Sequence, residues 1–264
     1  MSISFIGCGN MAGAIIRGIL SAKAVMPKEV FAFDTDTAKA DQLEGETGIC
    51  ICESASDAAV CGDYIVLAVK PNVIESVIKE IDPALQEQKT IVSIAAGKTI
   101  AFIESCFSEK HRIIRVMPNI NAKVSAACSA FCANNAVQNE DKEFVKKIFG
   151  AVGEITELPE SSFPLFGVIA GCVPAFAYMF IDAIARAGVE NGMSKSDALK
   201  FSAQAVLGSA KMVLESDAHP YELIDRVCSP GGTTIEGVIS LQADGFESAV
   251  HNAVNKAVEK DRLL

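Results

Sequence analysis

The first half of the chain alternates short apolar runs with segments whose apolar residues recur at helical spacing. Such alternation is typical of β-α-β units, whose strands are buried on both faces. The runs predicted to be strands are Ile3–Ile6, Val30–Asp34, Tyr64–Val69, Thr90–Ala95, Ile113–Met117 and Val124–Cys132. The segments predicted to be helices are Met11–Ser21, Asp36–Glu46, Val73–Ile81 and Ile100–Cys106. The pattern therefore predicts a mostly parallel sheet covered by helices on both faces.

From about Pro159 onward the chain shows only helical patterns. Gly192 is a helix stop, and the hydroxyl of Ser194 can cap the helix that follows it. The helices predicted here are Ala175–Gly188, Ser196–Glu215, Tyr221–Val227, Thr234–Gln242 and Phe246–Leu264. We expect an α/β domain over residues 1–158 and an all-α domain over residues 159–264. Because the apolar faces of the helical half point several ways and small residues allow close helix packing, we infer an intertwined homodimer.

One segment of the helical half has the composition of a membrane span. Phe163–Ile181 contains no charged residue and is just long enough to cross a bilayer. It also contains Pro164 and Pro174, its flanks are acidic, and no Lys or Arg stands beside its start. We therefore expect a helix buried between protein surfaces, and no membrane association.

Composition narrows the class further. Half of the 264 residues are hydrophobic, and the net charge is −10 without a basic run, so we expect no nucleic-acid partner. The nine cysteines are spread along the chain and the three histidines lie far apart, which favours buried reduced thiols over a metal site. The N-terminus lacks the basic region of a signal peptide, and we expect a cytoplasmic protein.

A glycine-rich motif follows the first predicted strand and opens the first predicted helix. Gly7, Gly9 and Ala12 fit the pattern G-x-G-x-x-G/A, which places a dinucleotide pyrophosphate at a helix N-terminus in Rossmann-type domains. The candidate cofactor contacts in this loop are Gly7, Cys8, Gly9, Asn10 and Met11. An acidic residue expected at the end of the second strand, Asp34, can accept hydrogen bonds from the adenosine ribose and would repel a 2′-phosphate, which favours NADH. The alternative is that Asp34 or Asp36 only caps the next helix.

The ends of later strands supply further candidate cofactor contacts, because ligands of open α/β sheets lie beyond the carboxyl ends of the strands. Two segments of mostly small residues leave room for a flat nicotinamide ring: Ala68, Val69, Lys70 and Pro71, then Ala95, Ala96 and Gly97. Lys70 is equally well explained as a surface lysine before a helix-starting proline. Asn119 either orients the nicotinamide carboxamide or caps a turn.

A second helix start, in Ser229–Glu236, is preceded by Pro-Gly-Gly and carries two threonines. The exposed N–H groups of Gly232 to Thr234 suit a carboxylate or phosphate, and the hydroxyl of Thr234 would then face the reacting centre. The alternative is a well-capped helix, since Thr233 and Glu236 have capping-box spacing.

With these motifs the chain resembles the pyrroline-5-carboxylate reductases over nearly its whole length. The segments that carry the resemblance are IGCGNM at 6–11, AVKP at 68–71, SIAAG at 93–97, RVMPN at 115–119, LGSAKMVLE at 207–215 and the stretch 219–242. The last segment is the most specific, whereas the dinucleotide motif is shared by many families.

The resemblance implies a Rossmann-type dinucleotide-binding domain followed by an all-α dimerisation domain, with many members forming decamers. It implies reduction of 1-pyrroline-5-carboxylate to L-proline with NADPH or NADH, the last step of proline biosynthesis. The active site would lie between the Rossmann domain of one subunit and the helical domain of its partner. The implied substrate contacts are Ser229, Gly231, Gly232, Thr233 and, through water, Asp217. Thr234 would be the catalytic residue, with its hydroxyl at the ring nitrogen.

The chain departs from the family's usual residues at several positions. Cys172-Val173 stands where Ser-Gly is usual, Ile120-Asn121 stands where Thr-Pro is usual, and Ala55 replaces an asparagine that often contacts the adenosine ribose. Val173 adds bulk near the expected substrate pocket, and so motivates a second reading, an imine or ketimine reductase with altered substrate size. A third reading is a regulatory protein that binds a dinucleotide without turnover, but the intact 231–234 segment argues against it.

Overall fold

A computed structural model describes residues 1–85 and 88–262. The described chain divides into two compact units, Met1–Gly171 and residues 172–262. The first unit contains a sheet whose strand order is β3-β2-β1-β4-β5-β6-β7-β8. Its strands are β1 (Ile3–Ile6), β2 (Val30–Phe33), β3 (Cys50–Ile51), β4 (Tyr64–Leu67), β5 (Thr90–Ser93), β6 (Arg112–Met117), β7 (Ala127–Ala133) and β8 (Gly153–Glu157).

The sheet is mostly parallel, as the sequence predicts. Neighbouring strands run parallel except at the junction of β6 and β7, where Val116 pairs with Phe131 in an antiparallel register. Because the chain leaves β1 toward one edge and β4 toward the other, the carboxyl ends of these two strands flank a topological switch point. Ligands of open α/β sheets bind at such points.

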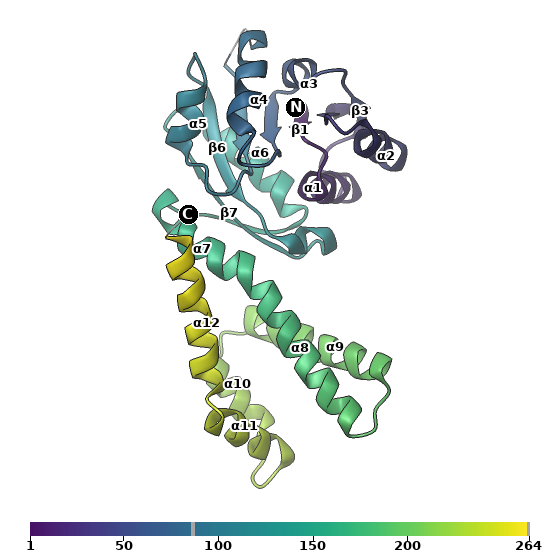
Figure 1. The fold of residues 1–264 in the computed structure, drawn as a ribbon, viewed down its shortest axis with the longest axis vertical. Coiled ribbons are helices and arrows are strands. Elements are labelled where there is room, and N and C mark those ends of the chain that lie inside the picture. Colours follow the sequence, from purple (N-terminus) through teal and green to yellow (C-terminus); the bar gives the residue numbers. More distant parts are fainter. Residues whose placement is uncertain (86–87, 263–264) are drawn as a thin grey trace. The chain divides into compact units, whose positions relative to one another are not determined.

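Helices cover both faces of the sheet (Figure 1). One buried cluster joins the sheet to α1 (Asn10–Ser21), α2 (Thr37–Thr47) and α6 (Asn139–Gly150). The other joins it to α3 (Ala55–Cys61), α4 (Ile74–Ile81) and α5 (Ile100–Cys106). The amphipathic pattern of α4 shows the cause, since Ile74, Ile78 and Ile81 recur at helical spacing and are all fully buried.

Several predicted elements differ from the observed ones. β7 begins at Ala127 and not at Val124, because Ile120–Val124 is the 3-10 helix η3, which ends at Ser125 in the left-handed conformation (φ 54°). The predicted strands ending at Asp34, Val69 and Ala95 stop earlier, so these residues lie in the loops beyond the sheet. The prediction also left β3, α3, α6 and β8 unassigned; β3 has only two residues, too few to show a period.

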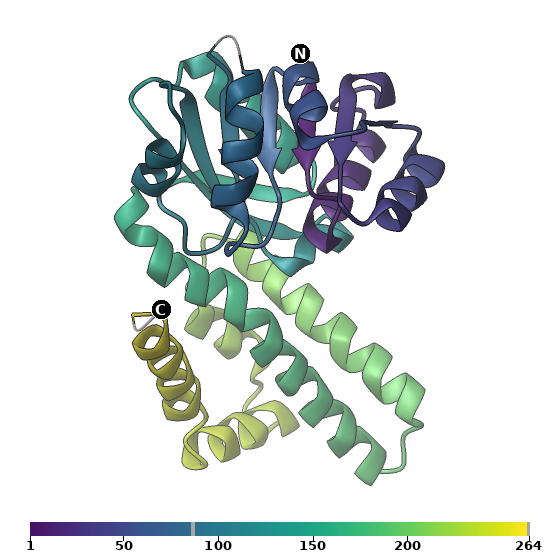
Figure 2. The ribbon, with the colours of Figure 1, turned by 45° about the horizontal axis from the view of Figure 1, so that its top comes forward.

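The second unit is helical. Its helices are α8 (Val173–Glu190), α9 (Lys195–Glu215), α10 (Pro220–Val227), α11 (Thr233–Ala243) and α12 (Phe246–Asp261). Ser194 caps α9 as predicted, with its hydroxyl accepting the N–H of Asp197. The last predicted helix ends at Asp261 within the described residues; residues 263–264 lie outside them. Helices α8 and α9 lie side by side (Figures 1 and 2).

The chain enters α8 through a short helix, α7 (Phe163–Gly167), and a π-helix, η5 (Val168–Cys172). The boundary between the two units falls at Gly171, inside this π-helix, whereas the sequence pattern placed it at residue 158. The continuous helix Glu160–Glu190 has the length and composition to cross a membrane, and 17% of its most apolar window is buried. Within one chain this helix is therefore mostly uncovered, and the predicted burial between protein surfaces is not seen there.

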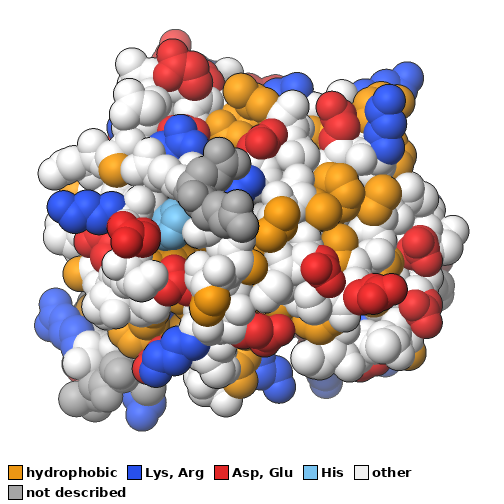
Figure 3. Space-filling model, turned by 90° about the horizontal axis from the view of Figure 1, so that it is seen from above, with side chains coloured by type: hydrophobic (Ala, Val, Ile, Leu, Met, Phe, Trp, Pro, Cys, Tyr) orange, Lys and Arg blue, Asp and Glu red, His pale blue; other side chains and the backbone are white. Residues whose placement is uncertain are grey.

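The face of the molecule shown in Figure 3 carries acidic and basic side chains interspersed among apolar ones. On that face neither sign of charge gathers into a broad patch.

Candidate active site

The glycine-rich loop joins β1 to α1 and has the shape that its sequence predicts. Gly7 has a φ of 106°, and a side chain there would bring Cβ to 2.9 Å from the carbonyl oxygen of Ala68. Only glycine fits this left-handed position against the neighbouring strand. At Gly9, by contrast, a Cβ would meet nothing within 4 Å, and no side chain caps the start of α1. The helix N-terminus thus faces open space that a pyrophosphate can enter, while Ala12 packs beneath it with 1% exposure.

Asp34 lies just beyond β2 and is held against this loop. One carboxylate oxygen accepts the N–H of Cys8 at 2.6 Å, and the other accepts the N–H of Asp36 at 2.8 Å. Asp36 occupies the N-cap position of α2 but makes no side-chain capping hydrogen bond, and its carboxylate pairs with Lys39 at 2.6 Å. Asp34 therefore braces the dinucleotide loop rather than capping α2. Each of its oxygens keeps a second lone pair that a ribose hydroxyl can use.

A pocket of about 330 Å³ lies at the carboxyl ends of β4, β5 and β6. It brings together seven of the predicted cofactor residues: Met11, Ala68, Val69, Lys70, Pro71, Ala95 and Ala96. The lining also includes residues that the sequence reading missed: Ile94, Arg115, Val116, Met117 and Pro118. Four of these residues belong to the motif RVMPN, for which the sequence predicts a contact only at Asn119.

Gly97 and Asn119 do not line this pocket. Asn119 is 6% exposed, and both ends of its amide are bonded within the protein. Its Nδ2 donates to the carbonyl oxygen of Ala170 at 2.9 Å, and its Oδ1 accepts the N–H of Cys128 at 3.2 Å. Ala170 lies in the π-helix, where the wider turn disturbs the regular bonding of carbonyl groups. Asn119 stands at the N-cap of η3 but makes no side-chain capping bond, so it does not cap a turn as the alternative predicted; its amide instead joins η5 to β7.

Lys70 is exposed. The proline after it does not start a helix as predicted: the Lys70 carbonyl accepts the N–H of Val73 in a turn, and α4 begins at Ile74.

The buried charged residue of this pocket is in an ion pair that the sequence did not reveal. Arg115 is 7% exposed, and its guanidinium donates to the carboxylate of Glu160 at 2.8 Å. It also lies over the ring of Phe163, 4.6 Å from the centroid. Glu160 is 45 residues away in sequence, so no local pattern signals the pair.

Two buried thiols, Cys8 in the cofactor loop and Cys132 on β7, have raised pKa values. Burial, reinforced by the charge of Asp34, raises the pKa of the Cys8 thiol to about 12. Burial, reinforced by Glu160, raises the pKa of Cys132 to about 12 as well. Both are therefore neutral at physiological pH, and neither serves as a nucleophile.

The predicted substrate loop lies in the helical unit, before α11. The N–H of Gly232 donates to the carbonyl oxygen of Ser229 at 3.0 Å, closing a turn with Pro230 second and Gly231 third. Gly231 has a φ of 67°, as the third position of a type II turn requires. A side chain at Gly232 would bring Cβ to 2.3 Å from the hydroxyl oxygen of Ser229. Pro-Gly-Gly is thus explained by the turn, and Gly232 does not offer the free N–H that we predicted.

The capping-box alternative for this loop is wrong. The N-cap of α11 is Gly232, no side chain bonds to the helix start, and Thr233 is already the first helical residue. The N–H groups of Thr233 and Thr234 have no acceptor within the described residues. The side chains of both threonines are exposed, as is that of Asp217 in the segment between α9 and α10. The helix start therefore presents two N–H groups and two hydroxyls to solvent.

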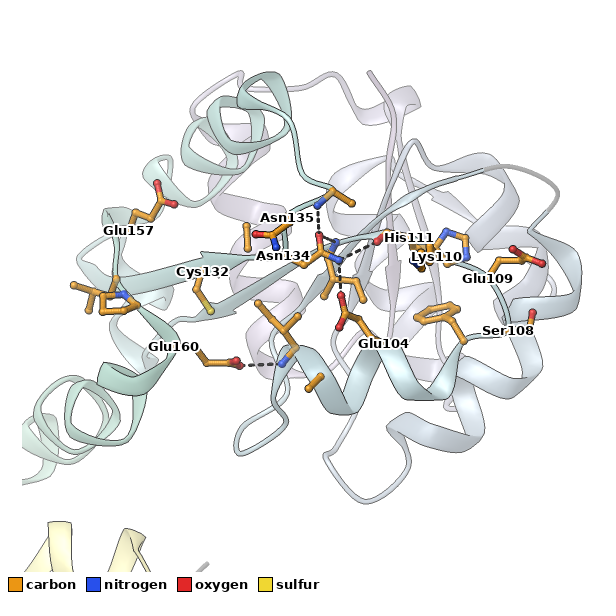
Figure 4. Close-up of a pocket in the computed structure, with 18 residues that line it drawn as sticks. Glu104, Ser108, Glu109, Lys110, His111, Cys132, Asn134, Asn135, Glu157 and Glu160 are labelled. Carbon is orange, nitrogen blue, oxygen red and sulfur yellow. Dashed lines mark hydrogen bonds between the residues drawn. The ribbon is translucent and has the colours of Figure 1, made fainter.

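A larger cavity, of about 1130 Å³, lies beside α5 and contains none of the predicted site residues (Figure 4). Its lining includes His111, whose Nδ1 accepts the N–H of Lys89 and whose pKa is lowered by burial. Glu160 reaches this cavity from the opposite end, where its carboxylate also accepts the N–H of Ile100 at 2.9 Å (Figure 4).

Comparison with known families assigns the two parts of the chain separately. A family described as NADP oxidoreductase, coenzyme F420-dependent, matches residues 2–97. A family described as pyrroline-5-carboxylate reductase dimerisation matches residues 160–264. With the dinucleotide loop and the pocket beside it, these matches define a nicotinamide-dependent oxidoreductase that acts on an imine.

Relatives extend over the whole chain. It is 43% identical over 263 residues to the pyrroline-5-carboxylate reductase of Escherichia coli (strain K12), covering 99% of this chain and 97% of that protein. It is 38% identical over 262 residues to the Methanosarcina acetivorans enzyme of the same name, with 99% and 97% covered. The chain therefore belongs to the pyrroline-5-carboxylate reductase family.

Solved structures agree. The NADP-bound pyrroline carboxylate reductase of Plasmodium falciparum superposes with a TM-score of 0.87 at 33% identity, covering 100% of this chain and 97% of that one. A pyrroline-5-carboxylate reductase from Coxiella burnetii gives 0.92 at 30% identity, covering 99% and 97%. The chain reduces 1-pyrroline-5-carboxylate in proline biosynthesis, using a nicotinamide cofactor.

Proposed function

We propose that the nicotinamide ring occupies the 330 Å³ pocket at the ends of β4, β5 and β6, with the pyrophosphate at the start of α1. The observation that carries this placement is that three segments far apart in sequence converge there: Met11 from α1, the 68–71 loop and the 95–96 loop. The open space at Gly9 and the small side chains of Ala68, Ala95 and Ala96 fit a flat ring and its diphosphate.

The substrate carboxylate binds at the start of α11. The N–H groups of Thr233 and Thr234, which have no acceptor in the described chain, suit an anion at the positive end of a helix dipole. The turn from Ser229 to Gly232 shapes the approach to them, and Asp217 acts through water. The side-chain hydroxyl of Thr234 hydrogen-bonds the ring nitrogen of the substrate.

The reaction requires few ionisable groups. A cyclic imine is readily protonated, and the nicotinamide cofactor supplies the hydride that its carbon accepts. The protein's contribution is to orient the substrate and to place a hydrogen bond at the nitrogen. Water relayed past Thr234 supplies the proton. The neutral thiols of Cys8 and Cys132 are consistent with a site that uses no covalent intermediate.

The working enzyme is a cytoplasmic homodimer in which the Rossmann domain of one subunit meets the helical domain of its partner, and dimers can assemble into decamers. The match of residues 160–264 to a dimerisation family supports this assembly. So does the exposure of large apolar side chains along α8 and α9, which a second copy would cover.

NADH is the preferred cofactor. The support is the position of Asp34 against the dinucleotide loop, where its charge would repel a 2′-phosphate. The P. falciparum relative was solved with NADP bound, so the preference of this chain depends on its own residues and is tested directly below.

The test is oxidation of NADH and NADPH with racemic 1-pyrroline-5-carboxylate, followed by absorbance, with proline identified as product. Thr234→Ala should lower kcat by about ten- to a thousandfold, the usual cost of losing one positioned hydrogen-bond donor. Thr234→Ser, which keeps the hydroxyl, is the matched control and should stay within a few-fold of the parent. Equal rates for Thr234→Ala and the parent would remove Thr234 from the mechanism.

A further inference from the structure

The nicotinamide pocket is bordered by a cation whose counter-ion lies outside the pocket. Arg115 lines the pocket, whereas Glu160, its partner at 2.8 Å, lines the separate cavity beside α5. The ion pair therefore forms part of the wall between the two spaces. The other charged residue of the pocket, Lys70, is exposed and its charge is screened by solvent.

Glu160 also fixes the pocket's shape. The carboxylate oxygen that accepts from Arg115 accepts the N–H of Ile100 at 2.9 Å as well (Figure 4). Ile100 begins α5, directly after the loop that carries Ala95 and Ala96 into the pocket. One side chain thus ties the end of β6 to the loop after β5.

The charge balance of this wall matters because the cofactor ring changes charge. The reduced nicotinamide is neutral and the oxidised ring carries one positive charge. A buried guanidinium without its counter-ion would therefore disfavour the oxidised ring, and a carboxylate without its guanidinium would favour it. Neither would act in this way on a ligand that lacks the ring.

We propose that the Arg115–Glu160 pair is a positioning pair that keeps the nicotinamide pocket electrically neutral and thereby sets the relative affinity for oxidised and reduced cofactor. This inference rests on the placement of the nicotinamide given under Proposed function. The pair lies outside the dinucleotide motif, yet through this ratio of affinities it would influence the balance between oxidised and reduced cofactor on the enzyme.

The experiment measures dissociation constants of the full-length enzyme for NAD⁺, NADH and ADP-ribose by calorimetry. Glu160→Gln keeps an acceptor for the Ile100 N–H but leaves the Arg115 guanidinium without a counter-ion. It should raise the dissociation constant for NAD⁺ about tenfold relative to that for NADH. A tenfold change corresponds to about 1.4 kcal/mol, the order of magnitude of a unit-charge interaction screened by a partly solvated protein environment. Arg115→Gln should shift the ratio in the opposite direction. ADP-ribose has the same net charge as NADH and lacks the ring, so its affinity should follow that of NADH in each variant.

The double variant Arg115→Gln/Glu160→Gln removes both charges and should return the ratio to within about twofold of the parent. The double variant also leaves no unpaired buried charge. It should therefore fold, and its affinity ratio can be measured even if a single variant fails to fold. Arg115→Lys retains the charge and should behave as the parent. Loss of affinity for all three ligands alike, or a ratio shifted in the same direction by both single variants, would show a purely structural role and overturn the proposal.

The variant Ala96→Leu distinguishes failure of the charge proposal from failure of the proposed nicotinamide position. Ala96 is exposed at the pocket, so a larger side chain there fills the proposed ring site without disturbing the core. It should weaken NADH and leave ADP-ribose binding unchanged. If NADH binding is unaffected, the placement of the ring is wrong. If Ala96→Leu weakens NADH while the Glu160→Gln ratio stays at the parent value, only the charge inference fails.

Discussion

The two units of the chain bury their apolar residues in different ways. In the sheet unit the largest side chains, such as Phe5, Phe131 and Phe149, are at most 1% exposed. In the helical unit Met179 is 74% exposed and Leu214 is 85% exposed. The sheet unit therefore closes its core within one chain, whereas the helical unit presents the apolar area that stable oligomers cover.

The same difference separates the two halves of the candidate site. Seven of the predicted cofactor residues line a pocket within the sheet unit, and their contacts can be named from one chain. The substrate loop has a defined turn and a defined helix start, but its threonines are exposed. A site that closes within a chain depends on that chain's own core, and a site that closes on assembly depends on the interface.

The strongest test of this comparison breaks the interface. Leu207, on α9, is 61% exposed in the single chain, and in the proposed dimer it would be covered. Leu207→Asp would place a charge in an apolar interface, at a cost of several kcal/mol for each copy. We expect monomers by light scattering, at least about a hundredfold loss of turnover, and retained cofactor binding.

Lys200→Asp, an exposed and already polar position on the same helix, is the control and should stay dimeric. A Leu207→Asp enzyme that remains a dimer with parental activity would place the interface elsewhere.

A second test addresses the internal stability of the sheet unit. Asp141 is 3% exposed and accepts hydrogen bonds from the Tyr64 hydroxyl, the Thr90 hydroxyl and the N–H of Gln138. Burial and the charge of Asp141 raise the pKa of Tyr64, so this phenol remains a donor. Asp141→Ala would leave these donors unpaired and should lower the free energy of unfolding by about 3 kcal/mol.

Urea unfolding measures this loss, and Glu140→Ala, which removes an exposed carboxylate next to it, should change stability by less than about 0.5 kcal/mol. The oligomeric state should be unaltered in both. If the Asp141→Ala dimer dissociated, the stability of the sheet unit and the assembly of the helical unit would be coupled, contrary to the comparison of their buried residues.

The smallest expected effect concerns cofactor choice within the sheet unit. Asp34→Ser keeps one acceptor for the loop N–H groups but removes the negative charge beside the ribose. The ratio of kcat/KM for NADPH to that for NADH should rise by about tenfold, equivalent to about 1.4 kcal/mol. Asp41→Ser, which removes an exposed charge from α2, should leave the ratio unchanged. No change with Asp34→Ser would show that Asp34 only braces the loop.

Much of this architecture could be predicted from local patterns. Gly7 and Gly9 stand where the dinucleotide motif places them, and the apolar spacing of α4 and α5 located those helices to within one residue. The predictions failed where an element was too short to show a period, as in β3, or where a turn overrode the pattern, as in η3. The capping box was wrong because Gly232, not Thr233, stands at the boundary of α11.

The sequence by itself determined the class of domain, the family and the positions of the two glycine-rich helix starts, because glycines, small residues and helix starts act through local backbone geometry. Only the tertiary structure decided which distant side chains meet. The Arg115–Glu160 pair, the bracing of Cys8 by Asp34 and the bonding of Asn119 to Ala170 join residues 45, 26 and 51 positions apart. Such contacts arise from the packing of whole elements against one another, and no spacing along the chain encodes them.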